Sequence, residues 1–271
     1  MAGRVSRSVA AGRLPHGDGW QVGAGWASAS QTLRRLPGVQ RAGSVLSEAG
    51  RGGAAPDSPS RSAGDRFPRD DDKPFLLQYY TKAAHCQDGD PWPFQSDHRY
   101  DQLFADIDVP TAATATAAHF ARLPKFLQES EARRRWKIRF ADPAMYQKSV
   151  KDYYRLVTGV DDVIGRMVNL LKKKGLFKNT VIIFTSDNGF YLGEHGLAGK
   201  WFMHEESIRL PLVICDPRLP RKEAGRRVSE PALNIDIAPT ILELAGLSVP
   251  ATVQGRSLVP LLQRRRVAWR T

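Results

Sequence analysis

The chain has 271 residues, of which 42% are apolar, and a formal net charge of +12. This length and apolar content suffice for one sizeable hydrophobic core. No stretch approaches the roughly 18 consecutive apolar residues that a membrane-spanning helix needs, so we expect no membrane span. Two cysteines, Cys86 and Cys215, form at most one disulfide, and their number assigns the chain to no compartment.

The positive charge is spread over three regions of different composition. Residues 1–70 hold ten Arg, no Lys and five acidic residues, residues 71–262 hold 26 basic and 23 acidic residues, and the last nine hold four Arg. The central region is therefore nearly neutral. Because nucleic-acid-binding proteins concentrate basic residues on one folded surface, this distribution argues against a nucleic-acid partner.

The same three regions give the expected domain organisation. Residues 1–70 are rich in Gly, Ser, Ala and Arg and lack a sustained apolar period, so we expect a disordered, low-complexity segment. No apolar segment of a secretory signal follows Met1. We expect residues 71–262 to form a folded domain and residues 263–271 to be a basic tail.

The folded region is predicted to begin with a strand and to continue into a long helix. Residues 74–80 are a hydrophobic strand candidate, and the loop at residues 85–100, rich in Pro, Trp and Asp, suits the rim of a pocket. Asp142 followed by Pro143 predicts the start of a helix that ends before Gly175. Its expected apolar stripe consists of Val150, Tyr154, Val157, Val160, Ile164, Met167 and Leu171.

A second strand, residues 180–185, leads directly into Ser186-Asp187-Asn188-Gly189. In open α/β folds the carboxyl ends of strands carry the functional site, and a carboxylate beside an amide oxygen is a ligand pair for a hard cation. Asp187 and Asn188 are therefore candidate metal ligands. The alternative is a simple Asx turn that leaves the strand, and the tetrapeptide alone does not separate the two.

The rest of the chain continues the alternation of strands and helices. Residues 211–215 are the next strand candidate, and Asp236 is expected to cap a helix that runs through Ile241 and ends at Gly246. The order of strand, helix, strand and helix predicts a doubly wound α/β fold with a mainly parallel sheet.

Six further segments of the chain form a set with a characteristic order and spacing. They are residues 73–77 (KPFLL), 82–85 (KAAH), 193–201 (GEHGLAGKW), 204–212 (HEESIRLPL), 234–241 (NIDIAPTI) and 254–258 (QGRSL). Together with the turn at residues 186–189, they strongly resemble the sulfatase family. The resemblance covers residues 73–262 and implies the C-terminal part of a catalytic domain of the alkaline phosphatase-like superfamily, incomplete at its N-terminus. Members of this family are commonly exported.

The resemblance implies roles for individual residues. It assigns Asp187 and Asn188 to a calcium ion beside the sulfate, and an amide ligand agrees with Ca²⁺ because the two-zinc sites of related phosphatases favour histidine there. Lys200 matches the lysine that contacts the sulfate oxygens, and an ammonium is suited to stabilising charge on them. Without the surrounding motif, a single lysine in a loop would be interpreted as a solvated surface charge.

Three further positions carry weaker assignments. His85 matches the histidine near the leaving-group oxygen, where an imidazole can donate a proton near neutral pH. Lys82 is kept as a weak substrate contact, since Ala84 replaces the proline that the family often has. His195 is a candidate substrate contact, and His204 lies in the same loop; the alternative for both is that they hold the loop by hydrogen bonds.

The sequence lacks the nucleophile and the first pair of metal-binding aspartates on which the chemistry of the family depends. Sulfatases use a Cys or Ser in a Cys/Ser-x-Pro-Ser-Arg signature, oxidised to formylglycine, and an earlier pair of aspartates. The nearest match, residues 57–61 (DSPSR), has Asp at the nucleophile position. We therefore expect a truncated, inactive sulfatase fragment whose parent hydrolyses a sulfate ester, such as that of a sulfated glycan. We expect the fragment to be oligomeric or to pair with its missing half. A non-catalytic binding protein, or a phosphatase or phosphodiesterase of the same superfamily, stays open.

Overall fold

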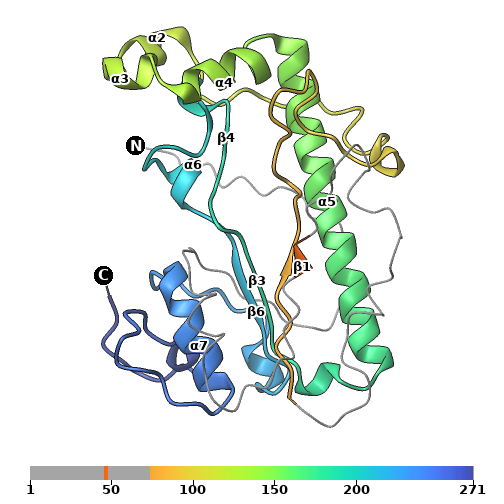
Figure 1. Ribbon diagram of the computed structural model, residues 1–271, viewed down its shortest axis with the longest axis vertical. Helices are drawn as coiled ribbons and strands as arrows, with labels where there is room; N and C mark the ends of the chain where they lie inside the picture. Colours follow the sequence, from red (N-terminus) through yellow and green to blue (C-terminus); the bar gives the residue numbers. More distant parts are fainter. Residues whose placement is uncertain (1–45, 48–73, 271) are drawn as a thin grey trace.

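The computed structural model describes residues 46–47 and 74–270 (Figure 1). Within these residues, no helix has the length and apolar content to cross a membrane. The expected disorder of residues 1–70 and the degenerate signature at residues 57–61 lie outside the described part, apart from β1 (Leu46–Ser47), which pairs in parallel with β2 (Tyr79–Tyr80). The strand expected at residues 74–80 is therefore limited to its last two residues.

The longest element is α5 (Pro143–Lys173), which runs along one side of the molecule in Figure 1. The carboxylate of Asp142 accepts a hydrogen bond from Met145 N at 2.8 Å, so it caps the helix as predicted. Gly175, with φ 71°, ends it, and Leu176 N donates to Leu171 O at 2.9 Å. Both predicted ends of this helix are confirmed.

The buried face of α5 differs from the expected stripe. Val150 and Leu171 are buried, but Val157 is 47% exposed, and the buried set also includes Tyr146, Leu156 and Asp152. The reason is electrostatic. The buried carboxylate of Asp152 accepts hydrogen bonds from Lys148 at 2.6 Å and Arg155 at 2.7 Å, and Arg155 also donates to the backbone of the loop before α2. These bonds turn that side of the helix toward the loop.

Beside α5, β3 (Ile182–Thr185) pairs with β6 (Leu212–Cys215). The two strands are antiparallel, so the mainly parallel arrangement that we expected is wrong for this pair. Thr185, the last residue of β3, lies opposite Leu212, the first residue of β6. The intervening chain therefore leaves and re-enters the sheet at the same end of the two strands. Parallel strands require a crossover connection of a dozen or more residues, usually a helix, that returns the chain to the opposite end of the strands. The segment between β3 and β6 makes no such crossover and instead extends away from the sheet.

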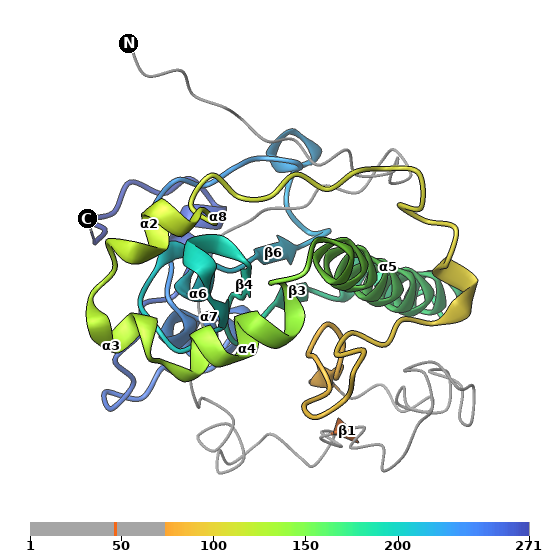
Figure 2. The same cartoon turned by 90° about the horizontal axis from the view of Figure 1, so that it is seen from above.

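That segment packs against a layer of short helices, α2 (Ala117–Ala121), α3 (Lys125–Gln128) and α4 (Glu131–Arg139). It contains β4 (Tyr191–Leu192) and β5 (Ala198–Gly199), which pair antiparallel, and α6 (Glu205–Ile208). In Figures 1 and 2 the three helices lie across one end of α5, above β4. The sequence reading did not predict α2, α3 or α4.

A second layer packs against one face of the β3–β6 pair. It consists of α7 (Ile237–Leu244) and α8 (Val259–Leu262), whose apolar residues pack on Leu212 and Ile214 of β6. Asp236 does not cap α7 through its side chain as expected. Its fully buried carboxylate instead accepts hydrogen bonds from Leu233 N and Arg256 N, both at 2.8 Å, and pairs with Arg270. Single 3-10 turns lie at His98–Tyr100, Phe177–Asn179, Glu194–Gly196, Arg221–Glu223 and Asn234–Asp236.

Candidate functional site

The turn that follows β3 is closed by its own side chains. Asn188 N donates to Asp187 Oδ1 at 3.0 Å, and Ser186 Oγ donates to Asn188 O at 2.9 Å. The Asn188 side chain donates through Nδ2 to Gly189 O at 2.7 Å, which leaves its Oδ1 as the atom suited to a cation. Asp187 is exposed and Asn188 is half-buried. The Asp187 carboxylate accepts from the N–H of the next residue and not from the one two positions on, so the bond pattern is not that of an Asx turn. Metal binding by Asp187 and Asn188 stays a prediction.

Gly189 fixes this turn against the rest of the fold. Its N–H donates to Ser207 O at 2.7 Å. A Cβ at this position would lie 2.2 Å from Glu206 O and 2.9 Å from Arg209 O, so only glycine allows the two backbones to approach this closely. The position of Asp187 and Asn188 is therefore coupled to α6.

The loop that contains Lys82 and His85 is a short turn in which His85 N donates to Lys82 O at 2.8 Å. His85 Nδ1 lies 2.7 Å from Cys86 O, and a carbonyl can only accept, so Nδ1 carries a proton and Nε2 is the nitrogen free to exchange one. Lys82 Nζ donates to Gln87 Oε1 at 2.6 Å, and both Lys82 and His85 are exposed. With Nδ1 held as a donor, Nε2 carries a proton only in the imidazolium form, and that is the proton that a general acid acting through Nε2 would donate.

Lys200 is half-buried and follows β5 directly. Burial raises the pKa of the neighbouring Cys86 thiol, while the positive charges of Arg139 and Lys200 act in the opposite direction. Cys86, which follows His85, and Ala198, two residues before Lys200, belong to the same buried cluster, so the two segments lie in one region of the fold. The structure thus brings two of the assigned positions, 115 residues apart in sequence, to the same region.

One hydrophobic cluster supports all three segments that carry assigned residues. It contains Cys86, next to His85, and Ala198, two residues before Lys200, and Phe190, two residues after Asn188, packs against it. Phe190 stacks on Tyr153 of α5 with ring centroids 6.2 Å apart. The long helix is therefore the common base on which the Lys82–His85 loop, the Asp187–Asn188 turn and the Lys200 segment converge.

His195 is held by hydrogen bonds on both ring nitrogens. Nε2 lies 3.2 Å from Glu206 Oε2 and donates to it, so Nδ1 accepts from His119 Nε2, 3.1 Å away. The residue has a left-handed backbone, φ 59°, and its N–H donates to Thr114 Oγ1 at 3.1 Å. These contacts match the alternative that this histidine holds its loop. A substrate contact by His195 stays a prediction.

Arg133 of α4 fixes the same loop from the other side. Its guanidinium lies between the rings of Phe120, 3.8 Å from the centroid, and Trp136, 4.0 Å from the centroid. From there it donates to Gly196 O at 2.9 Å, and burial lowers its pKa. The planar guanidinium both stacks and bonds, which a lysine ammonium would not reproduce.

His204 belongs to the same cluster. Its Nδ1 lies 2.7 Å from the Tyr191 hydroxyl, and its ring centroid is 4.7 Å from that of His195. Burial raises the pKa of Tyr191 to about 12, so the phenol stays protonated and donates to His204. Burial, followed by the positive charge that His195 carries when protonated, lowers the pKa of His204; Glu206 opposes this and His119 adds to it.

The lowered pKa of His204 predicts a pH-dependent stability. The folded state binds the proton of His204 less readily than the unfolded chain does, so its contribution is complete above the ordinary value of 6.5 and is lost as the pH falls below it. We expect the free energy of unfolding to fall as the pH drops below about 6.5, and the free energy of unfolding of a His204→Gln variant to fall less. Urea titrations over this range measure the effect. His98→Gln is the control because the His98 side chain is 99% exposed. An equal reduction of the pH dependence of the free energy of unfolding in both variants would contradict the assignment to His204.

Sequence reasoning did not identify His119, Arg133, Tyr191 or Glu206 as part of this region. Glu206 lies inside a segment that resembles the family, and its proximity to His195 could have been suspected from that loop alone. His119 and Arg133 come from helices that carry no recognisable motif, and only the packing of α2 and α4 brings them to the loop.

The predicted calcium site can be compared with the ligands that the described residues offer. Asp187 and Asn188 offer oxygen ligands of the kind that Ca²⁺ prefers, but a protein site needs six to eight oxygens. Within residues 46–47 and 74–270, no group of three or more His, Cys, Asp or Glu side chains is arranged to hold a metal ion. The ligands present thus fit calcium in chemical type, and they are fewer than a tight site requires.

Comparisons with known proteins bear on this arrangement. The family model described as Sulfatase matches residues 60–247. N-acetylglucosamine-6-O-sulfatase from Bacteroides thetaiotaomicron is 48% identical over 118 residues, which is 44% of this chain and 21% of that protein. A solved structure in complex with its substrate, D-glucosamine-2-N,6-O-disulfate, has a TM-score of 0.58 and 30% identity over 74% of this chain and 51% of that one.

A second solved structure is a phosphonate monoester hydrolase from Silicibacter pomeroyi. Its TM-score is 0.60, with 28% identity, and the match covers 72% of this chain and 38% of that one. The chain therefore spans from about a fifth to about half of the length of these three proteins.

Proposed function

The chain belongs to the sulfatase family, and from this premise we propose that its site binds the sulfate ester of an amino sugar for hydrolysis by a nucleophile that the sequence does not supply. The fold is that of the alkaline phosphatase-like superfamily, as its resemblance to sulfatase and phosphonate monoester hydrolase structures shows. The observation that carries the proposal is the convergence of the His85, Asn188 and Lys200 segments on one hydrophobic cluster at α5.

Each residue has a role that its surroundings support. Lys200 places an ammonium at the sulfate oxygens, where it stabilises the negative charge of the transition state. His85, with Nδ1 bonded to Cys86 O, protonates the leaving-group oxygen from Nε2 when the ring is in its imidazolium form, and the ring is left neutral with its proton on Nδ1. Asp187 and Asn188 are the residues that would hold Ca²⁺, which supplies positive charge beside the same sulfate. Lys82 lies in the His85 turn and adds a weaker contact to the substrate.

The class of sugar follows from the relatives. The name of the Bacteroides protein specifies a 6-O-sulfate of N-acetylglucosamine, and one matching structure holds a sulfated glucosamine. We infer that this site takes a glucosamine derivative with a sulfate on the primary hydroxyl group. A sulfated glycan that contains this unit is the corresponding polymeric ligand.

We also infer that this chain alone does not turn over its ligand. The sequence has no Cys/Ser-x-Pro-Ser-Arg signature, and acid catalysis by His85 does not replace the group that forms the covalent intermediate. The chain would then act as a binding module for a sulfate ester until the missing groups are supplied. This combines the sulfatase interpretation with the non-catalytic alternative that the sequence left open.

Phosphonate ester hydrolysis is the second candidate function. The TM-score of 0.60 to a phosphonate monoester hydrolase favours it, since the fold accommodates both chemistries. Asn188 in place of a histidine and the single ammonium of Lys200 favour the sulfate instead. Comparing a phosphonate monoester with a sulfate ester as ligands separates the two.

The test is calorimetric titration of the chain with glucosamine 6-sulfate in the presence of Ca²⁺. We expect Lys200→Ala to weaken binding roughly tenfold or more, because a hydrogen bond to a charged group contributes about 1.5–3 kcal/mol. Lys178→Ala, an exposed lysine after α5, is the matched control and should bind like the wild type. Unsulfated glucosamine should not bind measurably.

The same samples serve a turnover assay. We expect no sulfate release from an aryl sulfate above that of a His85→Ala variant. Equal affinities of the Lys200→Ala and wild-type chains, or tighter binding of a phosphonate monoester than of the sulfate ester, would contradict the proposed function. Turnover clearly above the His85→Ala level would contradict the inactivity.

A further inference from the structure

Three titratable side chains form a continuous hydrogen-bonded chain between α6 and α2. His195 Nε2 donates to Glu206 Oε2 at 3.2 Å, and His195 Nδ1 accepts from His119 Nε2 at 3.1 Å. Glu206 belongs to α6, His195 to the Glu194–Gly196 turn and His119 to α2. A carboxylate, a first imidazole and a second imidazole thus connect three elements of the fold.

His195 is the central member and is held by its backbone as well as by its ring. Its φ of 59° is left-handed, which is uncommon for a residue other than glycine. Such a conformation persists where the surrounding structure holds it in place. The N–H of His195 donates to Thr114 Oγ1 at 3.1 Å, and Thr114 lies just before α2. The α2 segment therefore binds this one residue through both its backbone and its ring.

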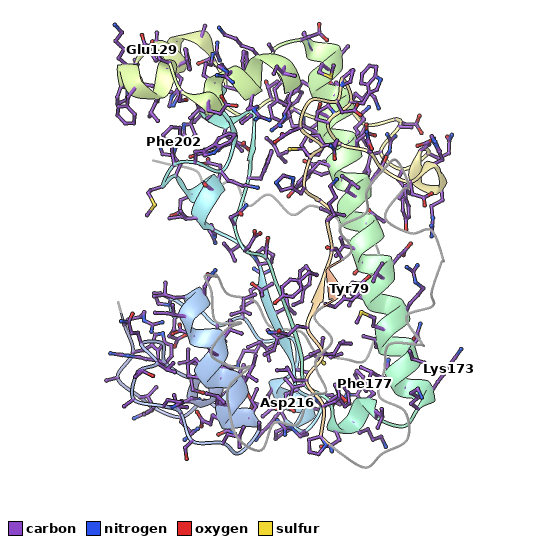
Figure 3. The ribbon with its side chains drawn as sticks, viewed as in Figure 1. Tyr79, Glu129, Lys173, Phe177, Phe202 and Asp216 are labelled. Carbon is purple, nitrogen blue, oxygen red and sulfur yellow. The ribbon has the colours of Figure 1, made fainter. Side chains whose placement is uncertain are left out.

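A second contact between α2 and the turn is apolar. Phe120, next to His119 on α2, packs on the buried cluster of Ala132, Tyr191 and Leu197, as Phe202 does. Figure 3 shows Phe202 below the helices α2 and α3. A Cβ at Gly196 would lie 3.0 Å from Phe120 Cδ2, so the helix and the turn are closely packed. This apolar contact does not depend on pH, whereas the bond between His119 and His195 does.

The bonds of the chain accommodate one added proton but not two. An imidazole changes its charge between about pH 5 and pH 8. In the neutral chain His119 donates from Nε2, so a first proton on its Nδ1 leaves the bond to His195 intact. A second proton has to enter at His195 Nδ1, which then faces the Nε2–H of His119. Two donors and two positive charges meet across a contact of 3.1 Å, and the bond is lost.

The surrounding groups favour one imidazolium over two. The charged and titratable groups around the histidine pair are Glu206 of α6, Glu194 of the turn, His204 ahead of α6, Tyr191 of β4 and Arg133 of α4. Glu206 bonds directly to the pair, whereas Glu194 accepts from Leu192 N at 2.6 Å and burial raises its pKa. Tyr191 remains a neutral phenol, and Arg133 adds a positive charge. A second imidazolium therefore lacks a carboxylate that bonds to it.

We propose that His119, His195 and Glu206 form an acid-sensitive latch, which joins α2 to the Glu194–Gly196 turn and opens when both histidines are protonated. The α2 segment is then held at the turn by Thr114 and Phe120 without the bond from His119, so it separates from the turn more often. The turn itself stays in place because Arg133 of α4 donates to Gly196 O at 2.9 Å. This device goes beyond the proposed function and does not depend on which ligand the site takes.

The test is hydrogen–deuterium exchange of the full chain followed by mass spectrometry, at about pH 7.5 and about pH 5, on either side of the ordinary histidine pKa. Exchange rates are converted to protection factors, which removes the effect of pH on the exchange chemistry. The reporters are the amides of His119, Phe120 and Arg122, which are bonded within the α2 segment. We expect their protection to fall roughly twofold to tenfold at the lower pH, the range of one hydrogen bond, while α7 keeps its protection.

Two substitutions of His119 separate the latch from a general weakening of the fold. The amide of His119→Gln can donate to neutral His195 Nδ1 or accept from its protonated form, so this variant should stay protected at both pH values. His119→Ala removes the bond and should lower the protection of α2 at both. His98→Gln, at a side chain that is 99% exposed, is the control and should behave like the wild type.

Equal protection of the wild-type α2 segment at the two pH values would overturn the latch. A His119→Gln chain that loses as much protection as the wild type at the lower pH would do the same, because it has no second imidazole. A loss of equal size in α7 would assign the change to the whole fold and also overturn the proposal. His119→Ala with wild-type protection at the higher pH would show that His119 does not hold α2. No ligand enters these measurements, so their outcome is independent of the proposed function.

Discussion

A Gly189→Ala variant should lose at least about 3 kcal/mol of its free energy of unfolding, which places it among the most damaging single substitutions. The added Cβ would lie 2.2 Å from Glu206 O and 2.9 Å from Arg209 O, and both atoms belong to the backbone of α6 and its end. Backbone atoms cannot rotate away as a side chain can. Relief of the clash therefore requires the turn after β3 to separate from α6 and to break the bond from Gly189 N to Ser207 O.

Chemical denaturation followed by circular dichroism measures this loss. Gly165→Ala is the control, because a Cβ there meets no atom within 4 Å and α5 should gain about 0.5–1 kcal/mol from the better helix former. We expect Gly189→Ala also to weaken glucosamine 6-sulfate binding, since Asn188 moves with the turn. A Gly189→Ala chain as stable as the wild type would show that the turn and α6 are not packed as described.

Replacement of Asp236 by alanine should cost about 3–5 kcal/mol, the range found when one partner of a buried ion pair is removed. Its carboxylate is fully buried and accepts hydrogen bonds from Leu233 N, Arg256 N and Arg270. The substitution leaves two backbone donors and a guanidinium without their acceptor. Because Leu233, Arg256 and Arg270 belong to different segments, the whole α7–α8 layer should loosen.

The control for this effect is an exposed ion pair. Lys125 and Glu129 are 3.6 Å apart, and their side chains are 85% and 66% exposed. Glu129→Ala should change the free energy of unfolding by less than about 0.5 kcal/mol. Thermal or urea unfolding of both variants tests the contrast. Similar small losses in the two would show that Asp236 is not the buried centre of its layer.

The sequence by itself determined the features that depend on neighbouring residues. Asp142, Pro143 and Gly175 mark the ends of α5 through local hydrogen bonds and backbone angles, and the structure confirms both ends. The turn of Asp187 and Asn188 at the end of β3 was identified for the same reason, because its bonds join residues one or two positions apart. The family was likewise readable from short segments in a fixed order.

Only the tertiary structure decided the features that depend on distant contacts. The antiparallel pairing of β3 and β6 follows from the path of 26 intervening residues, and no local pattern specifies where such an excursion returns. The buried face of α5 differs from the predicted one because Asp152 is paired with two cations of its own helix, of which Arg155 also binds a distant loop. Asp236 is a residue type that commonly caps helices, yet its buried carboxylate instead accepts hydrogen bonds from Arg256 N and Arg270.

The candidate site combines both kinds of information. The sequence named His85, Asn188 and Lys200 by their motifs, but these residues lie in three separate segments, and only packing on the cluster at α5 brings the segments together. His119 and Arg133 had no motif and became part of the region only through α2 and α4. The physical reason is general: the hydrogen bonds of caps and turns and the backbone angles involve only a few neighbouring residues, whereas burial, charge pairing and the long-range hydrogen bonds join residues that are distant in sequence.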